Sequence, residues 1–380
     1  MRFSVGMLVV GLAVSCGGGA TSSTACDVMT CSGCCDALGA CQPGDQLAAC
    51  GTVGGLCSAC ADSQRCAGGL CVAGEEFDGG SGGGSTGGGA GGGGGTTSSC
   101  ANITGDRQTQ VCLRWRCDRA ELSEGAWNGN VAACTAGDMT AAGRANALKV
   151  LNTYRFIADL PPVITSATRD QAAQECALMQ DAANALSHSP VPGAPCYTAS
   201  GADAAGNSNI SSGQAVRSID MYMSDYGNAT TMGHRRWFLS NQLGPVGIGG
   251  TSGASCHWVI GGSGTATKRF AAWPPPGPVP LQAIAIPTVG AGNSCDKTGW
   301  TVQTYATADN LANASVTVTD NGVSAPVTVT SLGANYGSRF AIRFVPMGWV
   351  SQAGHSYAVT VTAPALTVPI SYTVDVVACP

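Results

Sequence analysis

Two histidines are the residues of this chain best suited to chemistry. The sequence contains four histidines, and an imidazole near neutral pH can act as a general base, a hydrogen-bonding group or a metal ligand. His188 stands where a predicted helix ends, and His234 opens a short amphipathic segment, residues 233–239. His257 begins an apolar strand and His355 precedes a strand, so we assign structural roles to both. The candidate site therefore depends on His188 and His234 meeting in one groove.

The elements that must position these histidines lie in residues 100–272. Apolar residues recur there at steps of three and four, which is the spacing of one buried helical face. Short apolar runs flanked by glycines predict a hairpin of two strands. The expected helices span residues 141–157, 168–186 and 214–226, and the expected strands span 245–250 and 256–260. Three helices around a small sheet predict an α-β-α sandwich within an α+β protein.

The pattern changes to alternation in residues 278–380. Seven short segments in about 100 residues, separated by turns such as Asp320-Asn321-Gly322, are typical of an antiparallel β-sandwich of immunoglobulin type. Pro274 to Gly277 marks the expected boundary between the two domains. The expected strands lie near residues 281–286, 300–306, 314–319, 325–330, 340–345, 356–362 and 370–377. This sandwich would position the groove or contribute to adhesion.

Cysteine usage places the chain in an oxidising compartment. Ten of its 20 cysteines fall in residues 26–72, where large apolar residues are scarce. A unit this small needs cross-links, and in a secreted chain disulfides are favoured over zinc. Residues 74–99 follow as a glycine-rich linker, too poor in apolar groups to fold.

The N-terminus predicts export. Residues 1–15 combine Arg2 with an apolar run too short to span a bilayer, which indicates a signal peptide. A small residue before Cys16 resembles the lipobox of bacterial lipoproteins, so Cys16 is a candidate for lipidation, with ordinary cleavage as the alternative. We expect an extracytoplasmic protein, either a lipoprotein of the outer membrane or cell surface or a secreted protein. A net charge of −5 argues against nucleic acid as a partner.

The remaining cysteines suggest several pairings. We expect four cysteines of the lead-in to pair among themselves: Cys100, Cys112, Cys117 and Cys134. A Cys176–Cys196 disulfide would bracket the loop of His188, and a Cys295–Cys379 disulfide would join the ends of the β-sandwich. With Cys16 acylated an odd number remains, and Cys256 is the candidate for the unpaired one.

A series of short motifs resembles a known family. In chain order they are Asn152-x-Tyr154-Arg155, Cys176-Ala177, Ser187-His188-Ser189, Ser208-Asn209-Ile210, Gly233-His234-Arg235 and Val246-Gly247-Ile248-Gly249. Their order and spacing resemble the CAP superfamily (cysteine-rich secretory proteins, antigen 5 and plant pathogenesis-related 1 proteins), especially its bacterial branch. The resemblance covers about residues 145–262. It implies an α-β-α sandwich whose central cleft is lined by two histidines and two acids. Some members bind zinc there, and several bind sterols or other lipids.

The resemblance assigns roles to five residues. His188 and His234 match the two cleft histidines, and Asn209 matches the asparagine of a Glu-Asn-Leu motif. The first acid of that cleft is Ser208 in this chain. If Tyr222 takes the place of a helical tryptophan in the family, Asp225 takes the place of the second acid.

The loss of one acid shapes the functional hypotheses. His188 and His234 with one carboxylate could still hold a divalent metal such as zinc, but with a weaker ligand set. The first hypothesis is non-enzymatic binding of a small apolar ligand, lipid-like or sterol-like, or of a cell-surface partner. The second is a metal-assisted, protease-like hydrolase that uses His188, His234 and Asp225. The third is a structural surface protein with a vestigial cleft.

Overall fold

The chain divides into two units, Met1–Thr96 and Thr97–Pro380. The computed structural model describes residues 103–379, Cys100 and short stretches between residues 34 and 73. The expected signal peptide (1–15), the lipidation candidate Cys16 and the glycine-rich linker (74–99) lie outside the described residues.

Disulfides and very short strands make up the described part of the first unit. Cys34 bonds Cys57 and Cys50 bonds Cys66, and Cys35, Cys41 and Cys60 are also disulfide-bonded. The strands are β1 (Cys34–Cys35), β2 (Cys41–Gln42), β3 (Asp45–Gln46), β4 (Ala49–Cys50), β5 (Gly55–Leu56), β6 (Gln64–Ala67) and β7 (Leu70–Ala73). The disulfides confirm the expectation for these residues and indicate an oxidising, extracytoplasmic compartment.

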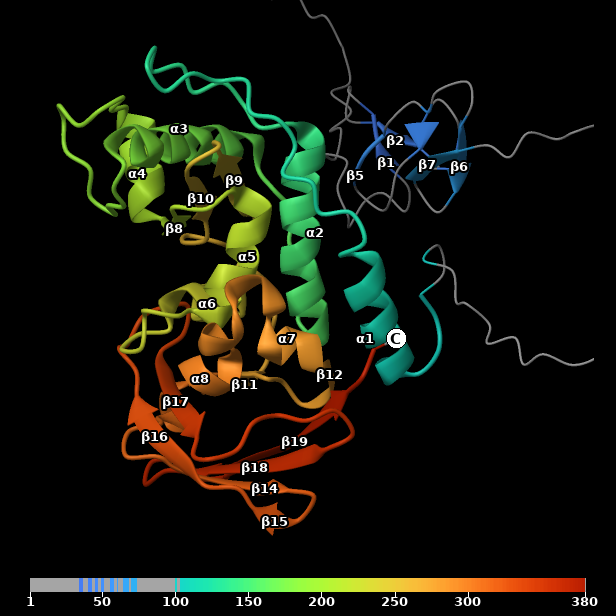
Figure 1. Cartoon of the computed structure of the whole chain (residues 1–380), viewed down its shortest axis with the longest axis vertical. Coiled ribbons are helices and arrows are strands. Elements are labelled where there is room, and N and C mark those ends of the chain that lie inside the picture. Colours follow the sequence, from blue (N-terminus) through green and yellow to red (C-terminus); the bar gives the residue numbers. More distant parts are fainter. Residues whose placement is uncertain are drawn as a thin grey trace, which may run out of the picture. The chain divides into compact units, whose positions relative to one another are not determined.

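Helices form the first half of the second unit (Figure 1). They are α1 (Arg107–Cys117), α2 (Ala141–Ile157), α3 (Ala167–Ala183), α4 (Ala199–Gly206), α5 (Ala215–Ser224) and α6 (Gly233–Phe238). The helix expected over 141–157 is confirmed to the residue. The other two expected helices end two to three residues early, because Asn184 and Asp225 take left-handed conformations that terminate α3 and α5.

A three-stranded antiparallel sheet lies between α3 and α5. Its strands are β8 (Ser208–Ser211), β9 (Gly247–Gly250) and β10 (Ser255–Trp258), in the order β8-β10-β9. A Cβ at Gly249 would lie 2.2 Å from the backbone of Ala173 in α3, and one at Gly250 would lie 3.1 Å from Ala215 in α5. Because successive residues of a strand face opposite sides, helices cover both faces of this sheet.

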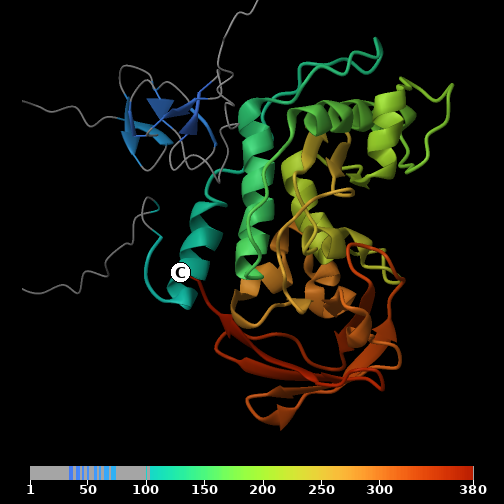
Figure 2. The ribbon, with the colours of Figure 1, turned by 180° about the vertical axis from the view of Figure 1, so that it is seen from behind.

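Two larger sheets form the C-terminal part of the same unit, at the lower end in Figure 1 and seen from behind in Figure 2. Their strands are β11 (Phe270–Trp273), β12 (Gly277–Pro280), β13 (Trp300–Thr304), β14 (Ser315–Asp320), β15 (Val323–Ser324), β16 (Val327–Ser331), β17 (Phe340–Pro346), β18 (Ser356–Thr362) and β19 (Ile370–Val377). One sheet has the order β11-β13-β17-β16 and the other β12-β19-β18-β14-β15. All pairs are antiparallel except β12–β19, which is parallel, so the expectation of a purely antiparallel sandwich was wrong at this edge.

One expected strand is a helix. Residues 281–286 were expected to be extended, but Leu281–Ala285 form α7. Leucine and alanine favour helix over strand, and Ala283 and Ile284 are fully buried on one side of this turn. Short helices also span Pro287–Val289, Ala291–Asn293, Cys295–Thr298 (α8) and Thr307–Asp309.

One hydrophobic core joins the helices to the C-terminal sheets. Trp273, on β11, is fully buried and packs edge-on against Tyr154 of α2, with ring centroids 5.3 Å apart. β11 precedes the proline-rich boundary expected at residues 274–277, yet it pairs with β13 of the C-terminal sheets. The helices around the two histidines and these sheets therefore share one interior.

The long-range disulfides differ from the expected pairs. Cys112 of α1 bonds Cys379 after β19, and Cys295 is buried and unpaired, so the expected Cys295–Cys379 disulfide was wrong. Within the lead-in only Cys100–Cys117 forms as expected. The pairing depends on which ends of the chain the shared core brings together, and spacing along the sequence does not carry that information.

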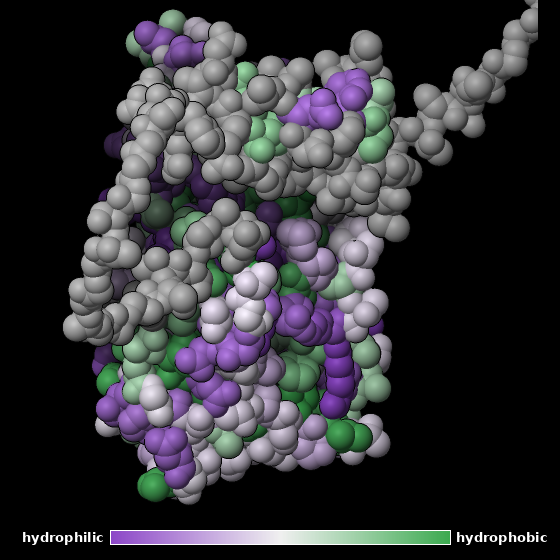
Figure 3. Space-filling model, turned by 90° about the vertical axis from the view of Figure 1, so that its right-hand side faces the viewer, coloured by the Kyte–Doolittle hydropathy of each residue, from purple (hydrophilic) through white to green (hydrophobic). Residues whose placement is uncertain are grey.

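The last two features concern membrane-spanning helices and the hydropathy of the surface. In the part of the chain that the structure describes, no helix has both the length and the hydropathy needed to cross a bilayer. The face shown in Figure 3 mixes hydrophilic and hydrophobic residues over its lower part, where the C-terminal sheets lie.

Candidate functional site

His188 and His234 line the same pocket. The pocket has a volume of about 630 Å³, and Ser208 and Asn209 also contribute to its wall. Four of the five residues that the sequence singled out are thus brought together. The fifth, Asp225, stands behind His234 and does not line the pocket.

Asp225 fixes the orientation of His234. Its Oδ1 lies 2.8 Å from Nδ1 of His234, and its side chain is fully buried while that of His234 is 28% exposed. A carboxylate at Nδ1 accepts a hydrogen bond from that nitrogen, so the neutral ring carries its proton on Nδ1. The Nε2 atom of His234 is left as a hydrogen-bond acceptor.

The end of α5 places Asp225 there. Asp225 caps the helix in a left-handed conformation with φ of 56°. Its carboxylate also accepts hydrogen bonds from Nδ2 of Asn228 at 3.1 Å and from the backbone N–H of Arg235 at 3.2 Å. Three donors around one buried carboxylate make this corner of the pocket rigid.

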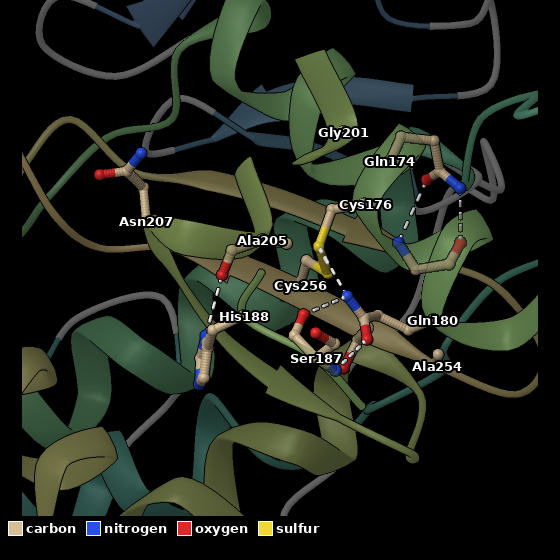
Figure 4. Close-up of a disulfide and its surroundings, with 12 residues drawn as sticks. Gln174, Cys176, Gln180, Ser187, His188, Gly201, Ala205, Asn207, Ala254 and Cys256 are labelled. Carbon is tan, nitrogen blue, oxygen red and sulfur yellow. Dashed lines mark hydrogen bonds between the residues drawn. A yellow bond between two sulfur atoms is a disulfide. The ribbon is translucent and has the colours of Figure 1, made fainter. Parts of the chain in front are cut away.

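His188 is held in the same way by a backbone carbonyl. Its Nδ1 lies 2.9 Å from the carbonyl oxygen of Ala205 in α4, and Figure 4 shows its other ring nitrogen at the far end of the ring. A carbonyl oxygen can only accept, so His188 donates through Nδ1. Its Nε2, like that of His234, is an acceptor.

Gln180 of α3 positions the segment before His188. Its Nε2 donates to the carbonyl oxygen of Ser187 at 2.9 Å, and its Oε1 accepts from the backbone N–H of Ser187 at 2.7 Å. Gln180 is 3% exposed. This paired contact, drawn in Figure 4, replaces backbone hydrogen bonds that the irregular segment could not otherwise make.

The disulfides near His188 are not the expected one. Cys176 of α3 bonds Cys256 of β10, and Cys196 bonds Cys134. The expected Cys176–Cys196 pair and the expected free Cys256 were therefore wrong. Cys176 and Cys256 both face the interface between α3 and the sheet and are fully buried, whereas Cys196 lies on the surface loop. The Cys134–Cys196 bond still anchors that loop, from the side of the lead-in.

Strand β8 contributes two polar side chains. Asn209 donates from Nδ2 to the carbonyl oxygen of His234 at 3.1 Å, which ties α6 to the sheet. The Oγ of Ser208 is buried and has no hydrogen-bond partner among the described residues. A buried hydroxyl without a partner is uncommon and marks a position that a ligand or water could satisfy.

The two arginines after His234 support the wall of the pocket. Arg235 and Arg236 are both almost fully buried. Arg235 donates to the carbonyl oxygens of Met223 and Gly299, at 2.6 Å and 2.7 Å. Burial lowers the pKa of Arg236 to about 10, so its guanidinium stays charged at neutral pH.

Aromatic residues of the pocket were not predicted. Tyr226, Trp237 and Tyr336 line it together with Ile260. Trp237 lies three residues after His234 and could have been found from helical spacing. Tyr336 comes from the loop between β16 and β17, about 100 positions away, and no sequence signal connects it to the histidines.

The other two histidines do not line this pocket. His257 is buried against Tyr222 and Phe238, with ring centroids 5.4 Å and 6.1 Å away, and burial lowers its pKa to about 3. His355 lies on the C-terminal sheets, where its Nδ1 is 2.7 Å from Oδ1 of Asp320.

Zinc fits this side-chain set poorly. Protein zinc sites use three or four protein ligands, and the described residues contain no group of three histidine, cysteine or acidic side chains placed to hold a metal. His188 and His234 would supply two nitrogens, but Asp225 is engaged with Nδ1 of His234 as an outer partner. We therefore derive no chemical step through a metal.

Comparison with known proteins adds no assignment. No protein-family model matches the chain, and no curated protein matches it.

Proposed function

We propose that this protein binds a small uncharged ligand, without converting it, through the pocket between His188 and His234. The main observation behind this proposal is that both imidazoles are fixed through Nδ1. Asp225 fixes His234, and the carbonyl oxygen of Ala205 fixes His188. Two oriented Nε2 acceptors in a pocket of this size are suited to recognition of a ligand that donates hydrogen bonds.

The proposal includes the family resemblance. A sheet covered by helices on both faces, with two histidines in one pocket, supports a CAP-like domain, and the two facing C-terminal sheets support an immunoglobulin-like sandwich. Several members of that family bind sterols or other lipids. Tyr226, Trp237, Tyr336 and Ile260 offer the apolar surface that such a ligand, or a protein partner at the cell surface, would need.

The proposal also places the protein outside the cytoplasm, as a lipoprotein anchored through Cys16 or as a secreted protein. The disulfides support the compartment. Mass spectrometry of the N-terminal peptide from the native host distinguishes the two forms: acylated Cys16 supports the anchor, and an unmodified N-terminus supports secretion.

Native mass spectrometry tests the binding function. We expect the full-chain protein from its own envelope to carry a bound small molecule. The His188→Ala/His234→Ala variant should lose it, while His355→Ala, which lies away from the pocket, should keep it. A ligand-free wild-type protein, or equal occupancy in the double variant, would contradict the proposal and favour a structural surface role.

One observation favours a hydrolase as the second candidate. The buried carboxylate of Asp225 behind His234 is the arrangement that makes an imidazole a general base toward water. A metal-assisted reaction would need a further ligand besides His188 and His234. Zinc content after dialysis, measured for wild type and His188→Ala, tests it: stoichiometric zinc that depends on His188 supports the hydrolase, and its absence removes the metal-assisted form.

A further inference from the structure

The lining of the two-histidine pocket disfavours charged ligands and acyl chains. Among the described residues that form it, none is lysine, arginine, aspartate or glutamate, and Ile260 is the one aliphatic side chain. An ion would find no opposite charge there. An acyl chain would find little of the aliphatic surface that pockets for lipid tails provide.

Aromatic side chains provide the apolar part of the lining instead. Tyr226 and Tyr336 are 42% and 40% exposed, which is unusual for large hydrophobic side chains, and Trp237 is partly buried beside them. Tyrosine and tryptophan present flat apolar rings with a polar tip. Such rings are suited to a ligand that is itself a ring with an apolar face.

Tyr336 is held in place by a buried network. Nη1 of Arg236 donates to the carbonyl oxygens of Thr231 and Gly333, at 2.9 Å and 2.6 Å. The guanidinium also lies 5.8 Å from the centre of the Tyr336 ring. The backbone N–H of Gly333 donates to the carbonyl oxygen of Thr230 at 3.0 Å. The loop of the C-terminal sheets is therefore docked onto the α6 side of the pocket.

Gly233 lets the tyrosine ring approach the helix that carries His234. A Cβ at Gly233 would lie 2.8 Å from Cδ1 of Tyr336, closer than carbon atoms pack. The ring of Tyr336 thus packs directly on the residue before His234, and both Tyr336 and His234 line the pocket.

The polar groups of the pocket favour a ligand that donates hydrogen bonds. Nε2 of His188 and Nε2 of His234 are acceptors, because both Nδ1 atoms donate elsewhere. The buried Oγ of Ser208 adds a third group without a partner among the described residues. A sterol carries one hydroxyl group, whereas a sugar ring carries several around an apolar C–H face.

We propose that the ligand is a neutral saccharide, with one ring stacked on the aromatic wall of Tyr226, Trp237 and Tyr336 and its hydroxyls donating to His188 and His234. The inference rests on the proposed binding function and narrows its ligand class. It makes Tyr336, a residue of the C-terminal sheets, a determinant of specificity.

A printed array of neutral and acidic glycans, probed with the full-chain protein, tests the ligand class. We expect binding to neutral glycans, and calorimetry with the best neutral oligosaccharide should then show a loss of about fivefold to tenfold in affinity for Tyr336→Ala. Tyr336→Phe keeps the ring and should keep most of the affinity. Tyr197→Ala changes a tyrosine outside the pocket and should change nothing.

The results of these experiments distinguish a failure of the saccharide proposal from a failure of the proposed binding function. No neutral glycan above background, binding of acidic glycans alone, or binding unaffected by Tyr336→Ala would overturn the saccharide proposal. Oleate and cholesterol are titrated in parallel. If either binds and loses affinity in His188→Ala/His234→Ala while glycans fail, the pocket is a binding site and its ligand is a lipid.

Discussion

The carboxylate of Asp225 and the imidazole of His234 form one unit, with Oδ1 and Nδ1 2.8 Å apart at the base of the pocket. The two residues are nine positions apart, and a helix end, a turn and the start of another helix bring them together. Because the carboxylate is fully buried and the ring is partly exposed, the carboxylate orients the ring while the ring meets the ligand.

Asp225→Asn tests this division of roles. Asparagine keeps the shape and tolerates the left-handed backbone, but it replaces one acceptor oxygen by a donor that must face Asn228 or Arg235. We expect about 1–3 kcal/mol lower free energy of unfolding, measured by urea denaturation. The ¹⁵N shifts of His234 should show a mixture of ring tautomers. An Nδ1–H tautomer that stays unchanged in Asp225→Ala, which removes both oxygens, would contradict the orienting role.

Gln180→Met tests how His188 is positioned. Methionine fills the same space but cannot bond both backbone groups of Ser187, so the segment should open more often. We expect faster amide hydrogen exchange at Ser187 and His188, with little change in the protection of α3. Gln352→Met, at an exposed glutamine, serves as the control. Equal exchange in wild type and Gln180→Met would mean that the disulfides alone hold the loop.

Sequence reasoning located the polar half of the site and missed the aromatic half. His188 stands where a helix was expected to end and His234 where a short amphipathic segment begins, and such boundaries can be read from local periodicity and stop signals. Asp225 was assigned only through the family resemblance, since the expected helix ran past it to residue 226. Tyr336 reaches the pocket only because β16 and β17 pack on the same core as α2 and α6. This packing is tertiary structure, and it leaves no pattern in the sequence near Tyr336.

The cysteines show the same limit. Cys100 and Cys117 pair across 17 residues, and their grouping was predictable from proximity in the chain. Cys112 and Cys379 pair across 267 residues, which depends on β19 ending beside α1. Helix α7 was missed for a local reason, since five residues are too few for helical periodicity to show, even though leucine and alanine favour helix.

The burial of His257 predicts that the free energy of unfolding falls in acid. Burial lowers the pKa of His257 to about 3 in the folded protein, while an unfolded histidine titrates near 6.5. Between these values the unfolded chain binds the extra proton, so the free energy of unfolding falls with falling pH by up to about 1.4 kcal/mol per pH unit. Above about pH 6.5 His257 is neutral in both the folded and the unfolded chain, so its contribution to the free energy of unfolding no longer changes with pH.

Urea denaturation from pH 7 to pH 4 measures this dependence of the free energy of unfolding on pH. His257→Leu cannot titrate at that position and should show a shallower decline than wild type, whatever its stability at pH 7. His355→Gln, which removes a histidine of the C-terminal sheets, is measured alongside as the control. Parallel curves for wild type and His257→Leu would rule out His257 as the titrating group.

The disulfide between Cys112 and Cys379 should be the more stabilising of two matched bridges. In the chain-entropy account, its loss costs about 5 kcal/mol, against about 3 kcal/mol for the shorter Cys100–Cys117 loop. Urea denaturation of Cys112→Ser/Cys379→Ser and of Cys100→Ser/Cys117→Ser compares them. If the short bridge proves as costly, strain or local packing governs these bonds rather than loop closure.

Substitutions at two glycines, one in contact with α6 and one not, test how the Tyr336 loop packs on α6. Gly337 and Gly348 both have positive φ, 68° and 79°, so alanine strains the backbone at each by about 1 kcal/mol. A Cβ at Gly348 would meet nothing within 4 Å, whereas one at Gly337 would lie 2.6 Å from the carbonyl oxygen of Arg236. The difference between the two variants therefore reports the contact between loop and helix.

We expect Gly348→Ala to lose about 1 kcal/mol of unfolding free energy and to keep ligand binding. Gly337→Ala should lose more and should also weaken binding, because the loop must retreat from Arg236 and carries Tyr336 with it. Urea denaturation and calorimetry with the pocket ligand measure both effects. If Gly337→Ala binds like Gly348→Ala, the aromatic wall tolerates displacement of the loop, and the C-terminal sheets contribute stability to the pocket but no specificity.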